Sequence, residues 1–130
     1  MCSDGRGPVP TLKSVMPTLR VEEMERAVQF YSMRLGFRIR WRSRSDGGGE
    51  TCMLESGQVA VLLSTGSHLG GPPRLTGTIY FDTDGVDELW ESLRSHAGIV
   101  WPISDTEHGT REFGIRDPDG YVLAFAEQRA

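Results

Sequence analysis

The chain has 130 residues, of which 38% are hydrophobic and 25% charged, and its formal net charge is −4. This composition is that of one globular domain large enough to bury a core. The negative charge argues against nucleic-acid binding, and no apolar run approaches the roughly 20 residues that a membrane span needs. The N-terminus lacks the apolar core of a signal peptide, and Cys2 and Cys52 have neither metal-site nor disulfide spacing. We therefore expect a soluble cytoplasmic protein with reduced thiols.

The N-terminal half has the pattern of one βαβββ module. Residues 1–13 are polar, carry prolines and glycines, and are expected to form a disordered tail. A strand is expected over 14–21, followed by a helix that ends at Gly36 as a left-handed cap. Five apolar residues recur at the spacing of one helical face: Met24, Ala27, Val28, Tyr31 and Leu35. Strands are then expected over 37–42, 51–55 and 58–65.

The C-terminal half repeats this pattern after a Gly- and Pro-rich linker over 66–76. A strand is expected over 77–83, and Asp84 is a suitable N-cap for a second helix that Gly98 would end. The apolar face of that helix comprises Val86, Leu89, Trp90, Leu93 and Ala97. Further strands are expected over 99–103 and in a terminal hairpin, which turns at Asp117-Pro118-Asp119-Gly120.

The two halves match at one offset. Met24 and Val86 are 62 positions apart, and so are Gly36 and Gly98. The match indicates an internal duplication, with modules over 14–65 and 77–128 inside one domain. The alternative is two unrelated amphipathic helices with ordinary glycine caps.

Several segments resemble the vicinal-oxygen-chelate superfamily of glyoxalases, dioxygenases and bleomycin-resistance proteins. The matching text is Met16-Pro17, Ala27-Val28-x-Phe30-Tyr31, Arg34-Leu35-Gly36-Phe37, Val86-Asp87-Glu88-Leu89-Trp90 and Gly109-x-Arg111-Glu112-Phe113, continuing to Arg116-Asp117-Pro118. The resemblance implies an α+β fold, in which two tandem βαβββ modules form an incomplete β-barrel cleft with the helices outside. It is strongest for the bleomycin-resistance branch, whose members are homodimers that bind a drug without modifying it. A homodimer with N-terminal strand exchange near Pro17 is therefore expected.

The resemblance also locates three positions that hold His, Gln or Glu ligands in metal-dependent members. Here they carry Met16, Thr78 and Ala124. A thioether, a hydroxyl and a methyl group do not supply such a ligand set. The histidines do not replace it, because they are expected in the linker, the last helical turn and a loop: His68, His96 and His108. We expect no metal and no cofactor, and a binding protein is favoured over an enzyme.

A cleft that holds a planar ligand needs aromatic faces and a few polar anchors. The candidates are Trp41, Tyr80, Trp101, His108, Phe113 and Glu112. Core packing is the alternative for Trp41 and Phe113, whereas Trp101 is expected at the rim because Pro102 and a loop over 102–110 follow it. Trp90 fits the core.

A row of arginines occupies alternate positions of the strand over 37–42 and just beyond it: Arg38, Arg40, Arg42 and Arg44. They are expected on one face, opposite Ile39 and Trp41, and face either solvent or an acidic ligand. Glu50 and Glu112 would instead suit a cationic ligand.

The sequence therefore predicts a metal-independent small-molecule binding protein that sequesters an antibiotic or an aromatic natural product. Two departures from the bleomycin-resistance pattern, His108 and Tyr121, leave the ligand open. The alternative is an enzyme of the same superfamily, with a displaced metal site or with metal-free acid–base chemistry through Glu112, His108 or Tyr80.

Overall fold

The computed structural model describes residues 14–44, 49–66, 72–75 and 77–129. The expected tail over 1–13, most of the expected linker, Cys2 and His68 lie outside the described residues. In the parts of the chain that the structure describes, neither helix has the length and apolar composition that a membrane crossing requires.

The first module is a four-stranded sheet with one helix. Its elements are β1 (Thr18–Arg20), α1 (Met24–Gln29), a π-helical continuation η1 (Phe30–Arg34), β2 (Arg38–Arg44), β3 (Glu50–Ser56) and β4 (Val59–Ser64). The strands lie in the order β1-β4-β3-β2, with β1 parallel to β4. Gly36 has a φ of 75° and ends the helical segment, as predicted. The first strand is shorter than the sequence indicated.

The second module repeats this topology. Its elements are β5 (Thr78–Asp82), α2 (Val86–Leu93), β6 (Gly98–Asp105), β7 (Thr110–Arg116) and β8 (Val122–Gln128), in the sheet order β5-β8-β7-β6. Three details of the prediction are wrong. The N-cap of α2 is Gly85 with a φ of 70°, not Asp84; the helix ends before His96; and Gly98 begins β6 instead of capping the helix.

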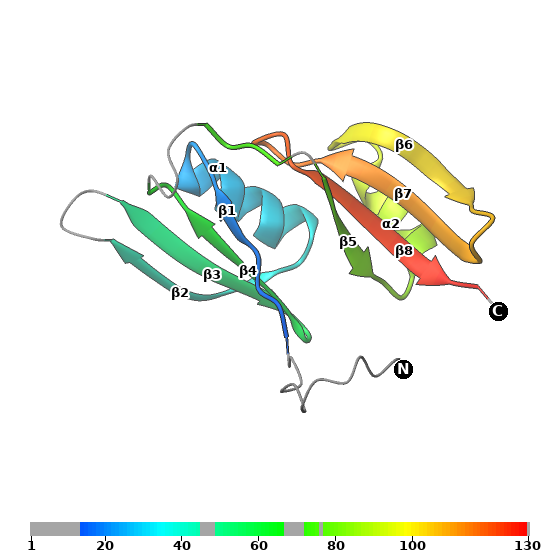
Figure 1. The fold of residues 1–130 in the computed structure, drawn as a ribbon, viewed down its shortest axis with the longest axis horizontal. Helices are drawn as coiled ribbons and strands as arrows, with labels where there is room; N and C mark the ends of the chain where they lie inside the picture. The colour runs from blue at the N-terminus through cyan, green and yellow to red at the C-terminus, as the bar shows by residue number, and fades with distance from the viewer. Residues whose placement is uncertain (1–13, 45–48, 67–71, 76, 130) are drawn as a thin grey trace, which may run out of the picture.

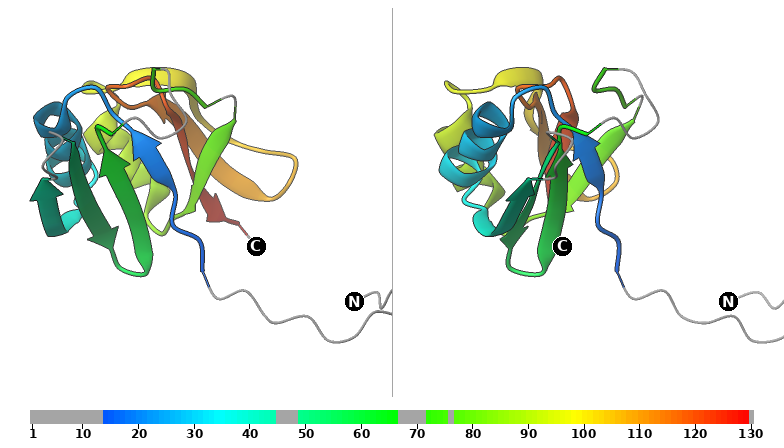
Figure 2. Two further views of the ribbon diagram at one scale, coloured as in Figure 1. Left: turned by 60° about the vertical axis from the view of Figure 1, so that its left-hand side comes forward. Right: turned by 90° about the vertical axis from the view of Figure 1, so that its left-hand side faces the viewer.

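The two open sheets lie side by side, and both helices cover the same side of them (Figures 1 and 2). This arrangement confirms the α+β class with two tandem βαβββ modules. Aromatic rings join the two helix-side cores, because Phe37 contacts Phe81 at 6.2 Å and Phe81 stacks on Phe125 at 5.2 Å between ring centroids. None of the described helices covers the opposite face of either sheet, and we call it the open face.

Each sheet has a β-bulge beside a tryptophan. The register shifts between Ile39 and Trp41 in β2, and between Ile99 and Trp101 in β6. A bulge adds one residue to a strand, so the alternation of faces is interrupted there. Ile39 lies opposite buried Leu54 on the helix side, and each tryptophan consequently faces the open side of its sheet.

The bulge divides the arginines into two pairs, so the expected single row is wrong. Arg38 and Arg40 bind Glu55 at 3.5 and 3.3 Å. Arg42 and Arg44 bind Glu50 at 3.1 and 2.9 Å on the helix side of β3. Glu50 is thus engaged by two guanidinium groups, which hold the pKa of its carboxyl below the ordinary value.

Candidate functional site

The open face of the second sheet has a floor of small residues. Gly114 of β7 lies opposite Ala124 of β8, and Glu112 lies opposite Ala126. Their neighbours Phe113 and Ile115 are buried on the helix side, so Gly114 and Glu112 face the open side. These small residues leave room above β7 and β8 for larger side chains from the two edge strands, β5 and β6.

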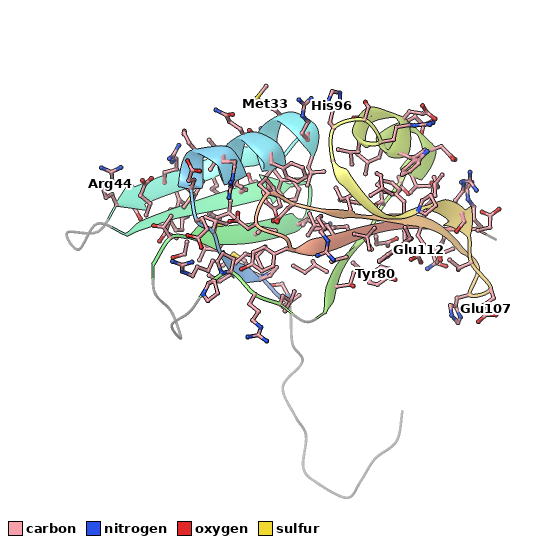
Figure 3. All side chains as sticks on the ribbon, turned by 90° about the horizontal axis from the view of Figure 1, so that it is seen from above. Met33, Arg44, Tyr80, His96, Glu107 and Glu112 are labelled. Carbon is pink, nitrogen blue, oxygen red and sulfur yellow. The ribbon has the colours of Figure 1, made fainter. Side chains whose placement is uncertain are left out.

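Tyr80 leans in from the edge strand β5. It lies opposite Ala124, and its hydroxyl donates a hydrogen bond of 3.0 Å to Oε2 of Glu112. The pair therefore meets above β8, where only alanine side chains project between them, and Figure 3 shows both side chains on the side away from α2. Thr110 donates to the other oxygen of Glu112 at 3.2 Å. Partial burial and the hydrogen bond to Glu112 raise the pKa of Tyr80 above its ordinary value of 10.0.

Trp101 leans in from the other edge strand, β6. It is half-buried and lies opposite Gly114. β6 continues to Asp105, so the loop expected from residue 102 begins only after that residue. Trp101 is consequently an open-face residue of a strand, and its indole and the Tyr80 ring lie over the same floor.

A groove with a volume of about 1480 Å³ runs along the free edge of β5. One wall is β5, including Tyr80, and the other is formed by Val59, Ala60 and Val61 of β4. Apolar side chains such as Phe37 supply much of the lining. The charged side chains among the described lining residues are three carboxylates: Asp82, Asp84 and Glu88.

The structure brings three of the six candidates together and separates the others. Tyr80, Trp101 and Glu112 share the open face of the second sheet. Trp41 lies on the open face of the first sheet, on the outer strand β2, and is 42% exposed. His108 is exposed at the tip of the β6–β7 hairpin beside Glu107, which Figure 3 labels at the far end of that hairpin.

Phe113 is a core residue. Its ring is fully buried, and its centroid lies 5.2 Å from the ring centroid of Trp90 and 5.4 Å from that of Phe125. The alternation of β7 assigns Phe113 to the helix side because the next residue, Gly114, faces the open side. Phe113 is therefore omitted from the binding face proposed below.

The three positions that correspond to metal ligands do not form a cluster of metal-binding side chains. Thr78 and Ala124 lie on the adjacent strands β5 and β8, two pairing positions apart, and Met16 precedes β1. Across the described ranges, no group of three His, Cys, Asp or Glu side chains could hold a metal ion. Methyl, hydroxyl and thioether groups do not fit a divalent cation that prefers imidazole or carboxylate.

Two residues of the face were missed by sequence reasoning. Gly114 and Thr110 support Trp101 and Glu112, respectively. A signal for Gly114 was present, because a glycine inside a strand often marks close approach by another group. Thr110 gave no signal in the sequence, since its hydrogen bond to Glu112 depends on the side-chain rotamers of both residues.

The sequence model of the Glyoxalase/Bleomycin resistance protein/Dioxygenase superfamily matches residues 11–125. The chain belongs to this superfamily, which confirms the resemblance seen in the terminal hairpin. It is 25% identical over 133 aligned positions to a bleomycin resistance protein of Geobacillus stearothermophilus, with 87% of this chain and 95% of that protein covered.

Solved structures show the same fold. TioX from Micromonospora sp. ML1 is 25% identical, with a TM-score of 0.70, 89% of this chain and 99% of that chain covered. TnmS3, an antibiotic binding protein from Streptomyces sp. CB03234, is 20% identical, with a TM-score of 0.77, 92% of this chain and 99% of that chain covered.

Proposed function

We propose that the protein binds a planar aromatic small molecule on the open face of the second sheet, without a metal ion. The observation that carries this proposal is the placement of Tyr80 and Trp101 over a Gly/Ala floor, beside the carboxylate of Glu112. Aromatic rings over a small-residue floor give a ligand large apolar contact with little loss of side-chain freedom.

The charges favour a ligand that carries positive charge. The groove beside this face is lined by three carboxylates, and Glu112 adds a fourth on the open face. Several negatively charged carboxylates in a partly apolar site attract cations and repel anions. Arg42 and Arg44 bind Glu50 on the helix side of the other sheet, and Arg38 and Arg40 are paired with Glu55.

The named relatives support an antibiotic as the ligand. One relative is a bleomycin resistance protein and one structural neighbour is an antibiotic binding protein. Binding without chemical change would sequester such a compound. We therefore infer an antibiotic-sequestering role for this chain.

A homodimer would complete the site. In one chain Trp41 and Trp101 lie on the outer strands of different sheets, at opposite ends of the molecule (Figure 1). A second copy is needed to bring the open face of a first sheet over that of a second. From Pro17 onward the chain pairs with its own β4, because the Pro17 carbonyl accepts a hydrogen bond from Leu62. The segment before Pro17 is the part that a second copy could cover, since Val15 is 87% exposed.

The test uses bleomycin and two three-ring probes of opposite charge, proflavine and anthraquinone-2-sulfonate. Bleomycin and proflavine should raise the melting temperature and quench tryptophan fluorescence. Proflavine should bind about tenfold more tightly than the sulfonate, and more weakly as salt increases. Trp101→Ala should weaken proflavine binding about tenfold, since a lost aromatic contact is worth ~1 kcal/mol or more.

Ile99→Ala is the matched control, because Ile99 is on the same strand but lies opposite the buried Ile115 and so faces the helix side; it should leave binding unchanged. The proposal is contradicted if bleomycin and proflavine neither raise the melting temperature nor quench fluorescence. Preference for the sulfonate would overturn the inferred ligand charge alone.

The Tyr80–Glu112 hydrogen bond favours a second candidate, a metal-free enzyme that moves a proton between ligand and carboxylate. The two functions differ in the fate of the ligand. Mass spectrometry of bleomycin recovered after prolonged incubation should show no change for a sequestering protein. A modified product that Glu112→Gln no longer forms would favour the enzyme.

A further inference from the structure

Gly114 lies in the interior of β7, where glycine weakens a strand. Its φ is outside the left-handed region, so the backbone itself does not require glycine. Its neighbours Phe113 and Ile115 are both fully buried, which shows that the strand is otherwise well packed. The reason for glycine must therefore be sought in what approaches it on the open face.

The indole of Trp101 occupies the space that a side chain at position 114 would fill. A Cβ built on Gly114 would lie 2.7 Å from both Cε2 and Cζ2 of Trp101 and 2.8 Å from Cδ2. Carbon atoms in contact are normally about 3.5–4.0 Å apart. Any residue other than glycine would push the indole away from β7.

The first sheet provides an internal comparison. Trp41 follows the same bulge and lies opposite Met53, which carries a long side chain where the second sheet has Gly114. Trp41 is 42% exposed, whereas Trp101 is half-buried and less exposed than Trp41. The tryptophan opposite the large residue Met53 is therefore the more exposed one, and the tryptophan opposite Gly114 is the more buried one.

We propose that Gly114 is a positioning residue that holds the Trp101 indole against β7 and so selects ligands with several fused rings. The sheet spans three strand spacings of about 4.8 Å, or about 14 Å, between β5 and β6. With the indole against the floor, one flat ligand can contact Trp101 and reach the Tyr80 ring. An indole pushed away from β7 would interrupt the flat surface between Trp101 and Tyr80. The selection of ligands rests on the proposed function, while the position of the indole does not.

The indole position is tested in ligand-free protein with Trp41→Phe and Trp90→Phe, which leaves Trp101 as the single tryptophan. Adding Gly114→Ala should raise acrylamide quenching about twofold and shift the emission to longer wavelength, because the ring moves into solvent. Gly98→Ala is the control, since nothing lies within 4 Å of a Cβ there. Unchanged quenching in Gly114→Ala would overturn the proposal.

A double-mutant cycle separates positioning from a general effect on the fold. Gly114→Ala should lower the melting temperature and weaken proflavine binding about tenfold in the wild-type background, and do neither in Trp101→Ala. It should also reduce the preference for proflavine over the single-ring cation benzamidine. Equal losses in both backgrounds would overturn the proposal. If wild-type protein binds neither bleomycin nor proflavine, the proposed function fails, but acrylamide quenching and the melting temperature still decide the role of Gly114.

Discussion

Asp117 is a buried carboxyl that joins the two modules. Its Oδ2 accepts a hydrogen bond of 2.8 Å from the Tyr31 hydroxyl of the first module. Its Oδ1 accepts the backbone N–H groups of Asp119 and Tyr121, both at 2.9 Å, which closes the terminal turn. Burial outweighs these hydrogen bonds and raises the pKa of Asp117 above its ordinary value of 3.8.

This raised pKa gives a stability change with a defined sign. The folded protein binds the Asp117 proton more tightly than the unfolded chain, so this group stabilises the fold most below pH 3.8. Its contribution falls as pH rises from there through the raised pKa. The difference in unfolding free energy between wild type and Asp117→Asn should fall over the same window in urea titrations.

Tyr31→Phe sharpens that prediction. It removes the hydrogen bond that lowers the Asp117 pKa, so the fall should extend to higher pH. It should also cost about 1–3 kcal/mol, because a buried acceptor loses a partner. A wild-type advantage over Asp117→Asn that grows with pH would contradict the assignment.

At the scale of elements, both helix starts are held by carboxylates from the terminal hairpin. Asp119 accepts the N–H of Glu22, just before α1, at 2.9 Å and contacts Arg26 at 3.4 Å. Glu127 accepts the N–H groups of Gly85 and Val86 at 3.2 and 3.3 Å. In the described chain, neither helix receives a side-chain cap from its own N-cap residue.

Asp119→Ala should therefore destabilise the protein by about 1 kcal/mol, the typical value of a lost cap. Asp119→Asn should cost less, because its amide oxygen can still accept the Glu22 N–H. Urea unfolding at neutral pH measures both. Identical values for the two variants would show that this hydrogen bond does not contribute.

The elements themselves were largely predictable from local patterns. Alternation located the strands, and helical spacing located α1 and α2, because these patterns reflect which faces are buried. The bulges beside Trp41 and Trp101 were not predictable, since the residues around Trp41 alternate as in a regular strand and those around Trp101 are apolar throughout. The partners of Asp119 and Glu127 were also hidden, because they lie 97 and 42 residues away in the sequence.

For the whole molecule, the division of the candidate site between two sheets makes the dimer testable. Light scattering at low micromolar concentration should give twice the 14.4 kDa mass of one chain. Val15→Asp should shift the protein toward monomer if the exposed segment before Pro17 is covered by a second copy. Met33→Asp is the control, because Met33 is 71% exposed on the helix side, away from the groove. A monomeric wild type would remove the shared site.

The candidate site could be predicted only in part at this scale. Residue type and parity identified Tyr80 as a cleft residue, and residue type alone suggested Glu112. Trp101 was expected at the rim from the proline and the loop after it, but the structure places it on a strand. Core packing was the stated alternative for Phe113, and the regular alternation of β7 agrees with it. Parity could not separate Trp41 from Trp101, because that outcome depends on how the two sheets are arranged.

The anchoring of both helices from the terminal hairpin also bears on synthesis at the ribosome. The chain is made from its N-terminus, so α1 is complete long before Asp119 exists, and α2 before Glu127. Neither helix can have its native anchor until residue 119, for α1, or residue 127, for α2, has emerged. A nascent chain halted before residue 119 would therefore expose two unanchored helices to proteases, and protection should arise only once residues 119 and 127 have emerged.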